Sequence, residues 1–129
     1  MCQRAPSQWQ QSAGAAALEA AAGRRHHWLA YASNVIEIMR FRLPPGADEA
    51  AFLAADRRVQ QDFACQQPGL LRRTTARGED GGWIVIDVWR SAADADACDA
   101  RWEHDEVTQA FMSLLDRPAV SVERYQELD

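Results

Sequence analysis

The sequence predicts an α+β fold in which helices cover one face of a four-stranded antiparallel sheet. Two segments, "VIEIMRFRL" and "WIVIDVW", are rich in the branched and aromatic residues that strands favour. Each is followed, at once or after a short turn, by a segment with the apolar period of a helix. Together with two further strand-like segments they give the order β-α-β-β-α-β, which is that of the ferredoxin-like split βαβ arrangement.

Length and composition indicate one globular domain preceded by an extension. The chain has 129 residues, of which 47% are hydrophobic and 26% are charged. Residues 1–33 are rich in alanine and contain few large apolar side chains, so packing could fix little of this segment. We therefore predict a flexible, Ala-rich N-terminal extension over 1–33 and a folded domain over 34–129.

The first half of the domain is predicted to run strand, helix, strand. A strand over 35–43 ends at "PPG", after which Asp48 can cap a helix. The helix would present one apolar face and end at "QQPG", before a second strand over 70–77. The residues on that helix face are Phe52, Ala55, Val59 and Phe63.

The second half is predicted to repeat this pattern after a hairpin. "GEDGG" connects the second strand to a third over 83–89, and Ser91 with Asp94 resembles a capping box that opens a helix. Val107 is out of phase with the apolar face of this helix, so we expect a break near "EHDE" and a shorter helix beyond it. A fourth strand follows Pro118. The strands over 35–43 and 83–89 would be neighbours at the centre of the sheet.

Charge and composition argue against several classes of function. Fourteen basic residues against nineteen acidic ones give a net charge of -5, which disfavours a nucleic-acid partner. No apolar run is long enough to span a bilayer, so we expect no membrane association. Three cysteines without CxxC spacing fit reduced thiols of a cytoplasmic protein better than a zinc site, and no metal is expected.

The carboxylate within "WIVIDVW" is the main functional clue, because an unpaired buried charge is costly. Strand alternation places Trp83, Asp87 and Trp89 on one side of their strand. We assign Glu37 and Met39 to the same side of the sheet, and also Glu123 and Tyr125. This side is too apolar to face water. We predict that a second copy of the sheet covers it, forming a dimeric α+β barrel around a cavity.

Aromatic walls with a few convergent polar groups are typical of a small-molecule pocket. Without ion-pair partners, the carboxylates would raise one another's pKa, and one could serve as a general base. A purely structural role is the alternative, with these acids paired to Arg72 or Arg73 or to groups of the partner subunit. The candidate catalytic residues are Glu37 and Asp87, and the candidate substrate-binding residues are Met39, Trp83, Trp89, Glu123 and Tyr125.

Residues 34–129, about three quarters of the chain, resemble an antibiotic biosynthesis monooxygenase (ABM) domain of the dimeric α+β barrel superfamily. The resemblance depends on "FRLPPGADEAAFLAA", "QQPGLLRR", "GWIVIDVWRSAADADA" and "VTQAFMSLLD". Its most specific part is the acid, one residue, tryptophan and a helix-opening serine, here Asp87 to Ser91, although relatives usually have glutamate as the acid. By this resemblance Trp89 matches the pocket tryptophan of such enzymes.

The resemblance implies a monooxygenase that acts on a small aromatic or quinol-like substrate and needs no cofactor. Haem-degrading relatives use an Asn and a His where this chain has Met39 and Phe111, so haem binding is the weakest of the hypotheses. A non-catalytic dimeric domain that binds a small ligand, or only associates with itself, is the alternative. Because one fold carries many activities, the motifs identify the fold better than the reaction.

Overall fold

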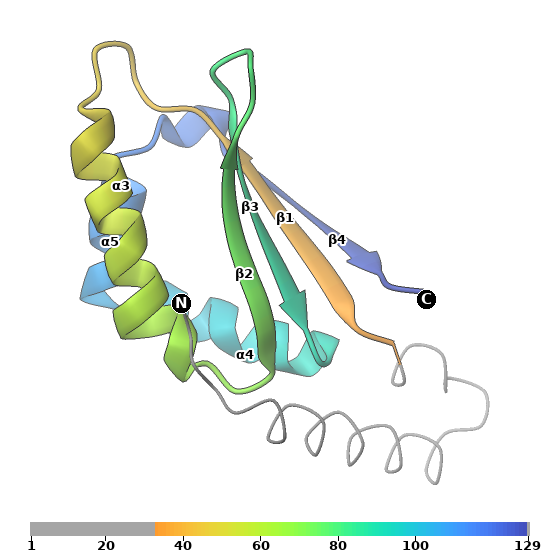
Figure 1. The fold of residues 1–129 in the computed structure, drawn as a ribbon. Coiled ribbons are helices and arrows are strands. Elements are labelled where there is room, and N and C mark those ends of the chain that lie inside the picture. Colours follow the sequence, from red (N-terminus) through yellow and green to blue (C-terminus); the bar gives the residue numbers. More distant parts are fainter. Residues whose placement is uncertain (1–32, 129) are drawn as a thin grey trace, which may run out of the picture.

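The computed structural model describes residues 33–128, and the predicted extension lies outside the described residues except for Ser33. Three long helices stand against one side of a four-stranded sheet (Figure 1). The strands are β1 (Val35–Phe41), β2 (Leu70–Arg77), β3 (Trp83–Trp89) and β4 (Ser121–Gln126). The helices are α3 (Glu49–Arg58), α4 (Ala92–Trp102) and α5 (Glu106–Ser113).

All pairings in the sheet are antiparallel, and the strand order is β2-β3-β1-β4. β1 and β3 therefore lie side by side at the centre, as predicted. The register places Glu37 of β1 directly opposite Asp87 of β3, and Asp87 opposite Arg73 of β2. On the other side of β1, Glu37 is opposite Arg124 of β4. Four charged residues thus meet across one row of the sheet.

The predicted helix boundaries agree closely with the structure. Asp48 caps α3 by accepting a hydrogen bond from the Ala51 N–H at 3.1 Å. Ser91 caps α4 in the same way, from the Asp94 N–H at 3.1 Å. The expected break between α4 and α5 is present, and there Asp105 caps α5. After α3 the chain continues through a π-helical turn (η1, Val59–Phe63) and a 3₁₀ turn (η2, Ala64–Gln66) before β2. A last 3₁₀ turn (η3, Arg117–Ala119) leads from α5 into β4.

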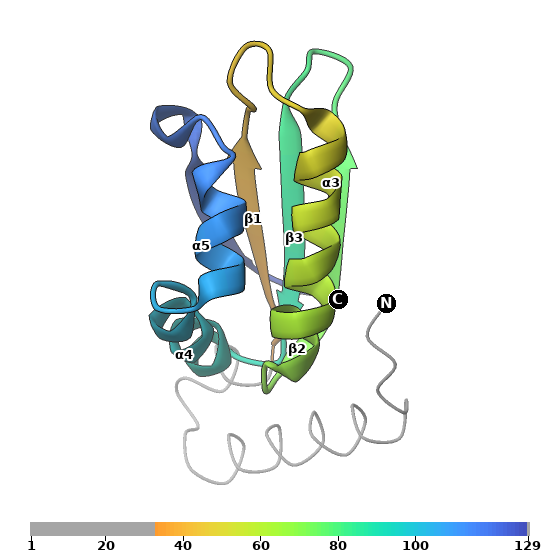
Figure 2. The ribbon, with the colours of Figure 1, turned by 90° about the vertical axis from the view of Figure 1, so that its left-hand side faces the viewer.

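The prediction of which sheet face is covered by helices is wrong. In Figure 2 the helices α3 and α5 stand in front of the sheet. The residues packed between these helices and the sheet include the aromatic side chains of Phe41, Phe52, Trp83 and Phe111. The Trp83 and Phe52 ring centroids are 4.9 Å apart, and Phe41 packs edge-on against Phe111 at 6.0 Å. The tryptophan-bearing face therefore packs against the helices of the same chain and forms the core. A second copy of the sheet is not needed to cover it.

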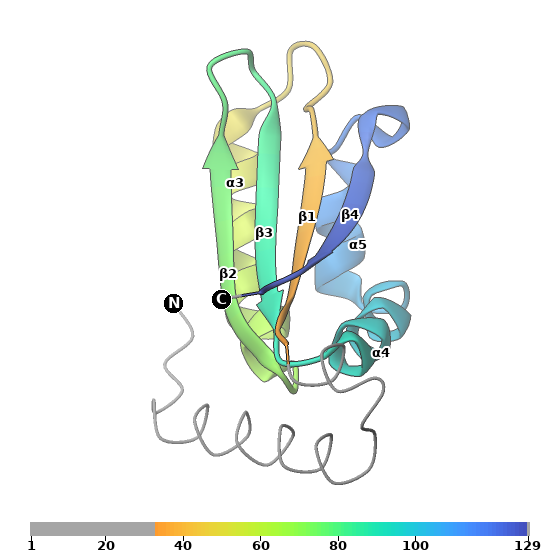
Figure 3. The ribbon, with the colours of Figure 1, turned by 90° about the vertical axis from the view of Figure 1, so that its right-hand side faces the viewer.

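The opposite face of the sheet carries smaller aliphatic residues, and no helix of residues 33–128 lies over it (Figure 3). The cross-strand pairs Ile38 with Ile86 and Ile36 with Val88 lie here. Tyr125 and Glu123 of β4 are opposite Ile36 and Ile38, so they also belong to this open face. The prediction that Glu123 and Tyr125 share a face with Asp87 is therefore wrong.

Candidate functional site

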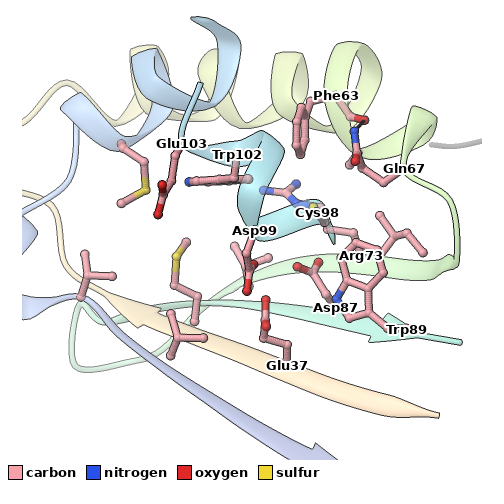
Figure 4. A pocket seen from close by; sticks show the side chains of 17 residues that line it. Glu37, Phe63, Gln67, Arg73, Asp87, Trp89, Cys98, Asp99, Trp102 and Glu103 are labelled. Carbon is pink, nitrogen blue, oxygen red and sulfur yellow. Dashed lines mark hydrogen bonds between the residues drawn. The ribbon is translucent and has the colours of Figure 1, made fainter. Parts of the chain in front are cut away.

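A cavity of about 320 Å³ lies between the sheet and the helices. Its floor comes from β1 and β3, and its walls come from α4, from the turns η1 and η2, from α5 and from the neighbouring strands (Figure 4). The lining residues are Glu37, Met39, Phe63, Ala64, Gln67, Leu70, Arg73, Val85, Asp87, Trp89, Cys98, Asp99, Trp102, Glu103, Met112, Val120 and Val122.

Asp87 is the buried carboxylate of this site that lacks a partner among the described residues. Its Oδ1 is buried and has no hydrogen bond, and no ion pair to Asp87 is found within residues 33–128. Burial raises the pKa of Asp87 to about 7; nearby Arg73 opposes this rise, and the negative charge of Glu37 adds to it. An acid with this pKa exchanges its proton near neutral pH, which is the property required of a general base.

Glu37 is held by an arginine. Arg124 donates from Nε to Glu37 Oε2 at 2.8 Å, from Nη1 to Asp96 at 2.6 Å and from Nη2 to Asp99 at 2.8 Å. This single guanidinium ties β4 and β1 to α4 beside the cavity. Burial raises the pKa of Glu37, and the hydrogen bond from Arg124 opposes that rise. Glu37 is therefore a poorer candidate for a base than Asp87, because Arg124 already stabilises its ionised form.

Arg73 does not pair with Asp87, although the two are opposite each other in the sheet. Its Nη2 lies 2.7 Å from Asp56 Oδ1, and its side chain is only 4% exposed. Thr75 also donates to Asp56 Oδ1 at 3.0 Å, and Gln60 accepts from Arg73 Nη1 at 3.3 Å. The structural alternative predicted from sequence, in which Arg72 or Arg73 pairs with the acids, is not the arrangement observed.

Aromatic rings enclose the site. Trp89 is 1% exposed, and its Nε1–H has no hydrogen-bond acceptor within the described chain. Trp102 packs edge-on against Phe63, with ring centroids 5.6 Å apart. The site therefore combines flat apolar walls with the carboxylate of Asp87, which suits a small aromatic molecule with a polar substituent.

The structure brings four of the seven predicted site residues together. Glu37, Met39, Asp87 and Trp89 all line the cavity. Trp83 lies outside it, packed among Phe41 and Phe52, because it sits at the far end of β3. Glu123 and Tyr125 lie on the open face, where the tyrosine hydroxyl donates to Glu123 Oε2.

Sequence reasoning missed the contribution of α4. Cys98, Asp99 and Trp102 recur at helical spacing and face the cavity, and Arg124 completes the site from the edge strand. The capping residue Ser91 could have revealed this contribution. It starts α4 two residues after Trp89, so the helix must lie near this end of the sheet. Within residues 33–128 no group of three His, Cys, Asp or Glu side chains could hold a metal ion.

The cysteines in the described chain differ in state. Cys98 is a free, buried thiol, and burial raises its pKa to about 12, with the charge of Asp87 adding to the effect. It is therefore not poised as a nucleophile. Cys65 is disulfide-bonded, so the prediction of reduced thiols is wrong for this residue. The cytoplasmic location stays a prediction.

Close packing at Gly69 and hydrogen bonds of Asp94 and Arg90 hold the start of β2 against the start of α4. Gly69 adopts a φ of +81°, and a Cβ there would lie 2.4 Å from the Asp94 carboxylate. Asp94 in turn accepts from Ser91 Oγ at 2.8 Å and from Arg90 Nε at 3.0 Å. The Arg90 N–H donates to the Gly69 carbonyl at 2.8 Å. The start of β2 is thus fastened to the start of α4, next to the cavity.

Comparison with solved structures shows where this architecture occurs. A protein of Chloroflexus aurantiacus J-10-fl assigned as an antibiotic biosynthesis monooxygenase superposes with a TM-score of 0.57 at 17% identity, over 75% of this chain and 95% of that one. SnoaB, a cofactor-independent oxygenase from Streptomyces nogalater, superposes with a TM-score of 0.53 at 20% identity, over 75% and 93%. The fold is ABM-like.

Other structures with this ABM-like fold carry no stated activity. A conserved protein of Methanosarcina mazei Go1 superposes with a TM-score of 0.60 at 8% identity, over 74% of this chain and 94% of that one. No family model and no curated protein matches the sequence. At these identities the likeness concerns the fold, so the reaction has to be argued from the site. No helix in the described part of the chain is long and apolar enough to cross a membrane.

Proposed function

We propose that this ABM-like chain is a cofactor-independent monooxygenase that oxidises a small aromatic or quinol-like substrate in the cavity between sheet and helices. The observation that carries the proposal is Asp87, an unpaired carboxylate with a pKa of about 7 in an aromatic cavity. The oxygenase activity of SnoaB, which shares the fold, is consistent with it.

Asp87 would start the reaction by removing a proton from the substrate. An electron-rich carbanion or phenolate can then transfer electrons to O₂ directly. For an activated methylene, one oxygen atom becomes the carbonyl oxygen of the product and the other leaves as water with the two methylene protons. A desolvated carboxylate is the stronger base for this step, and the walls formed by Trp89 and Trp102 would hold the ring system against it.

The experiment is oxygen consumption by the purified full chain with anthrone-type and quinol substrates. We expect kcat/KM to rise with pH and to level off above about 7, because Asp87 must be ionised to act as base. Asp87→Asn should lower kcat/KM by about a hundredfold or more. Asp62→Asn, on the exposed surface of η1, is the matched control and should leave it unchanged. No rate above buffer with any substrate would contradict the proposal.

A non-catalytic ligand-binding domain is the second candidate. It is favoured by the engagement of Glu37 and Asp99 with Arg124, which leaves Asp87 as the one cavity carboxylate that combines burial with the lack of a partner among the described residues. A binding site needs no second acid or base. Stoichiometric binding of an aromatic ligand without oxygen uptake or product formation would support this candidate over the oxygenase.

A further inference from the structure

The cavity lining carries a surplus of negative charge. Four carboxylates line the cavity, against one guanidinium, that of Arg73. Arg73 already pairs with Asp56 at 2.7 Å, so its positive charge is balanced by a carboxylate of the protein. The four acids are Glu37, Asp87, Asp99 and Glu103.

The ion pairs around the cavity do not cancel this surplus. Arg124 is shared among Glu37, Asp96 and Asp99, one cation for three acids. Arg101, on α4, donates to Gln67 at 2.7 Å and adds a further cation. Counting the lining residues with these partners leaves six carboxylates, Glu37, Asp56, Asp87, Asp96, Asp99 and Glu103, against three guanidinium groups, Arg73, Arg101 and Arg124. A ligand therefore enters a site of negative electrostatic potential. The largely apolar walls of the cavity screen this potential poorly.

Asp87 is the group of this acidic site that a ligand can engage. Its carboxylate lines the cavity and forms no hydrogen bond or ion pair among the described residues. Buried polar groups are rarely left without partners. The partner that this carboxylate lacks is a donor, which a neutral hydroxyl-bearing molecule can supply.

From these observations we propose that the cavity selects uncharged hydroxyarenes and rejects their carboxylate-bearing analogues. The hydroxyl group of either compound could donate to Asp87. The carboxylate of the analogue would add a negative charge to a cavity that Asp87 and Glu103 already line. This inference rests on the proposed function and narrows its substrate class to neutral compounds.

The test is a binding measurement with matched probes at a pH of about 8, where Asp87 is ionised. Hydroxynaphthamide and hydroxynaphthoate share size, shape and hydroxyl group and differ in one negative charge. We expect the naphthoate to bind the full chain about tenfold more weakly or worse, since one unit charge placed near another in a partly buried site has at least this effect. Calorimetry or tryptophan fluorescence gives both dissociation constants.

Charge-neutralising variants assign the effect to the cavity. Asp87→Asn and Glu103→Gln keep side-chain size, and each should improve naphthoate binding about threefold or more while changing naphthamide binding less. Glu103 lies at the end of α4, in the more accessible part of the lining, so its variant serves if Asp87→Asn does not fold. Glu79→Gln, in the exposed β2–β3 turn, should leave the ratio of the two constants unchanged.

The outcomes separate this inference from the proposed function. Equal binding of naphthamide and naphthoate, or a ratio unaffected by both cavity variants, overturns the charge selection and leaves the oxygenase proposal standing. Selective naphthamide binding without any oxygen uptake supports the selection and counts against the oxygenase. Failure of both probes to bind at their solubility limit overturns the inference, because neither hydroxyarene then enters the site.

Discussion

The ionisation of Asp87 is a residue-scale property with a measurable effect on stability. Its pKa is about 7 in the folded chain, whereas an unburied aspartate has a value of 3.8. Between these values the unfolded chain loses the proton and the folded chain keeps it, so stability falls as pH rises through this window. Above about 7 both states are ionised, and the cost of burying the charge is fully present. The charges that act on Asp87 besides its burial are those of Arg73, Glu37, Asp99 and Asp56.

The substitution Asp87→Asn should therefore raise stability relative to the wild type more at pH 8 than at pH 4. We expect the difference in unfolding free energy between variant and wild type to change by on the order of 3 kcal/mol between these two pH values, in favour of the variant at the higher one. Urea denaturation at both pH values measures it. A difference that is the same at both would show that Asp87 is solvated in the folded protein.

The buried pair of Arg73 and Asp56 gives a second prediction at this scale. Removing the Asp56 charge leaves a guanidinium that is only 4% exposed without its partner. Asp56→Asn should lower the free energy of unfolding by about 3 kcal/mol. Arg77 and Glu49 form the matched exposed pair, at 57% and 47% side-chain exposure, so Glu49→Gln should cost no more than about 1 kcal/mol. Chemical denaturation of both variants decides whether burial makes this difference.

At the scale of elements, the contact between Gly69 and Asp94 joins the start of β2 to the start of α4. Gly69→Ala would place a Cβ 2.4 Å from Asp94, which Ser91 and Arg90 hold in place. Gly46 has a similar positive φ of +76° but open space around it. Both substitutions carry the backbone strain, so only the first adds a clash. We expect Gly69→Ala to lower the melting temperature clearly more than Gly46→Ala, and equal losses would show that Asp94 rotates away at no cost.

The break between α4 and α5 also has an energetic basis at this scale. Asp105 Oδ1 accepts from the Val107 N–H at 2.8 Å and from the Thr108 N–H at 3.2 Å, so it starts a new helix in a new direction. This redirection lets Phe111 reach Phe41 and Phe52 while Cys98 and Trp102 remain over the cavity. Helical phase alone predicted this break, because Val107 could not share a face with Trp102.

At the scale of the whole molecule, the open face of the sheet predicts self-association. It carries an aliphatic patch of Ile36, Ile38, Ile84, Ile86 and Val88, with Tyr125 at its edge. A contiguous apolar sheet face is costly to expose, and a second copy related by a two-fold axis would cover it. The homodimer thus stays a proposal, but on the face opposite to the one predicted from sequence.

Sedimentation of the purified chain tests this dimer. We expect a two-subunit species that Ile86→Arg converts to single chains, because a charge would be buried at the centre of the contact. Leu53→Arg, on the outward side of α3 with 37% exposure, is the control and should leave the association unchanged. Single chains in the wild type at working concentration would contradict the proposed dimer but not the cavity, which one chain forms alone.

Local sequence determined the elements, their order and their caps, because turn sequences, capping residues and apolar periods act within a few residues. It also determined that Asp87, Trp89 and Glu37 share a side, since strand alternation and the pairing of β1 with β3 require it. Only the tertiary structure decided which side the helices cover. Both sides of β3 are apolar, so alternation could not choose, and the aromatic side chains of α3 and α5 made the choice by packing on Trp83 and Phe41. The register of β4 likewise depended on pairing across the sheet, which placed Arg124 beside Glu37 and moved Tyr125 to the open face.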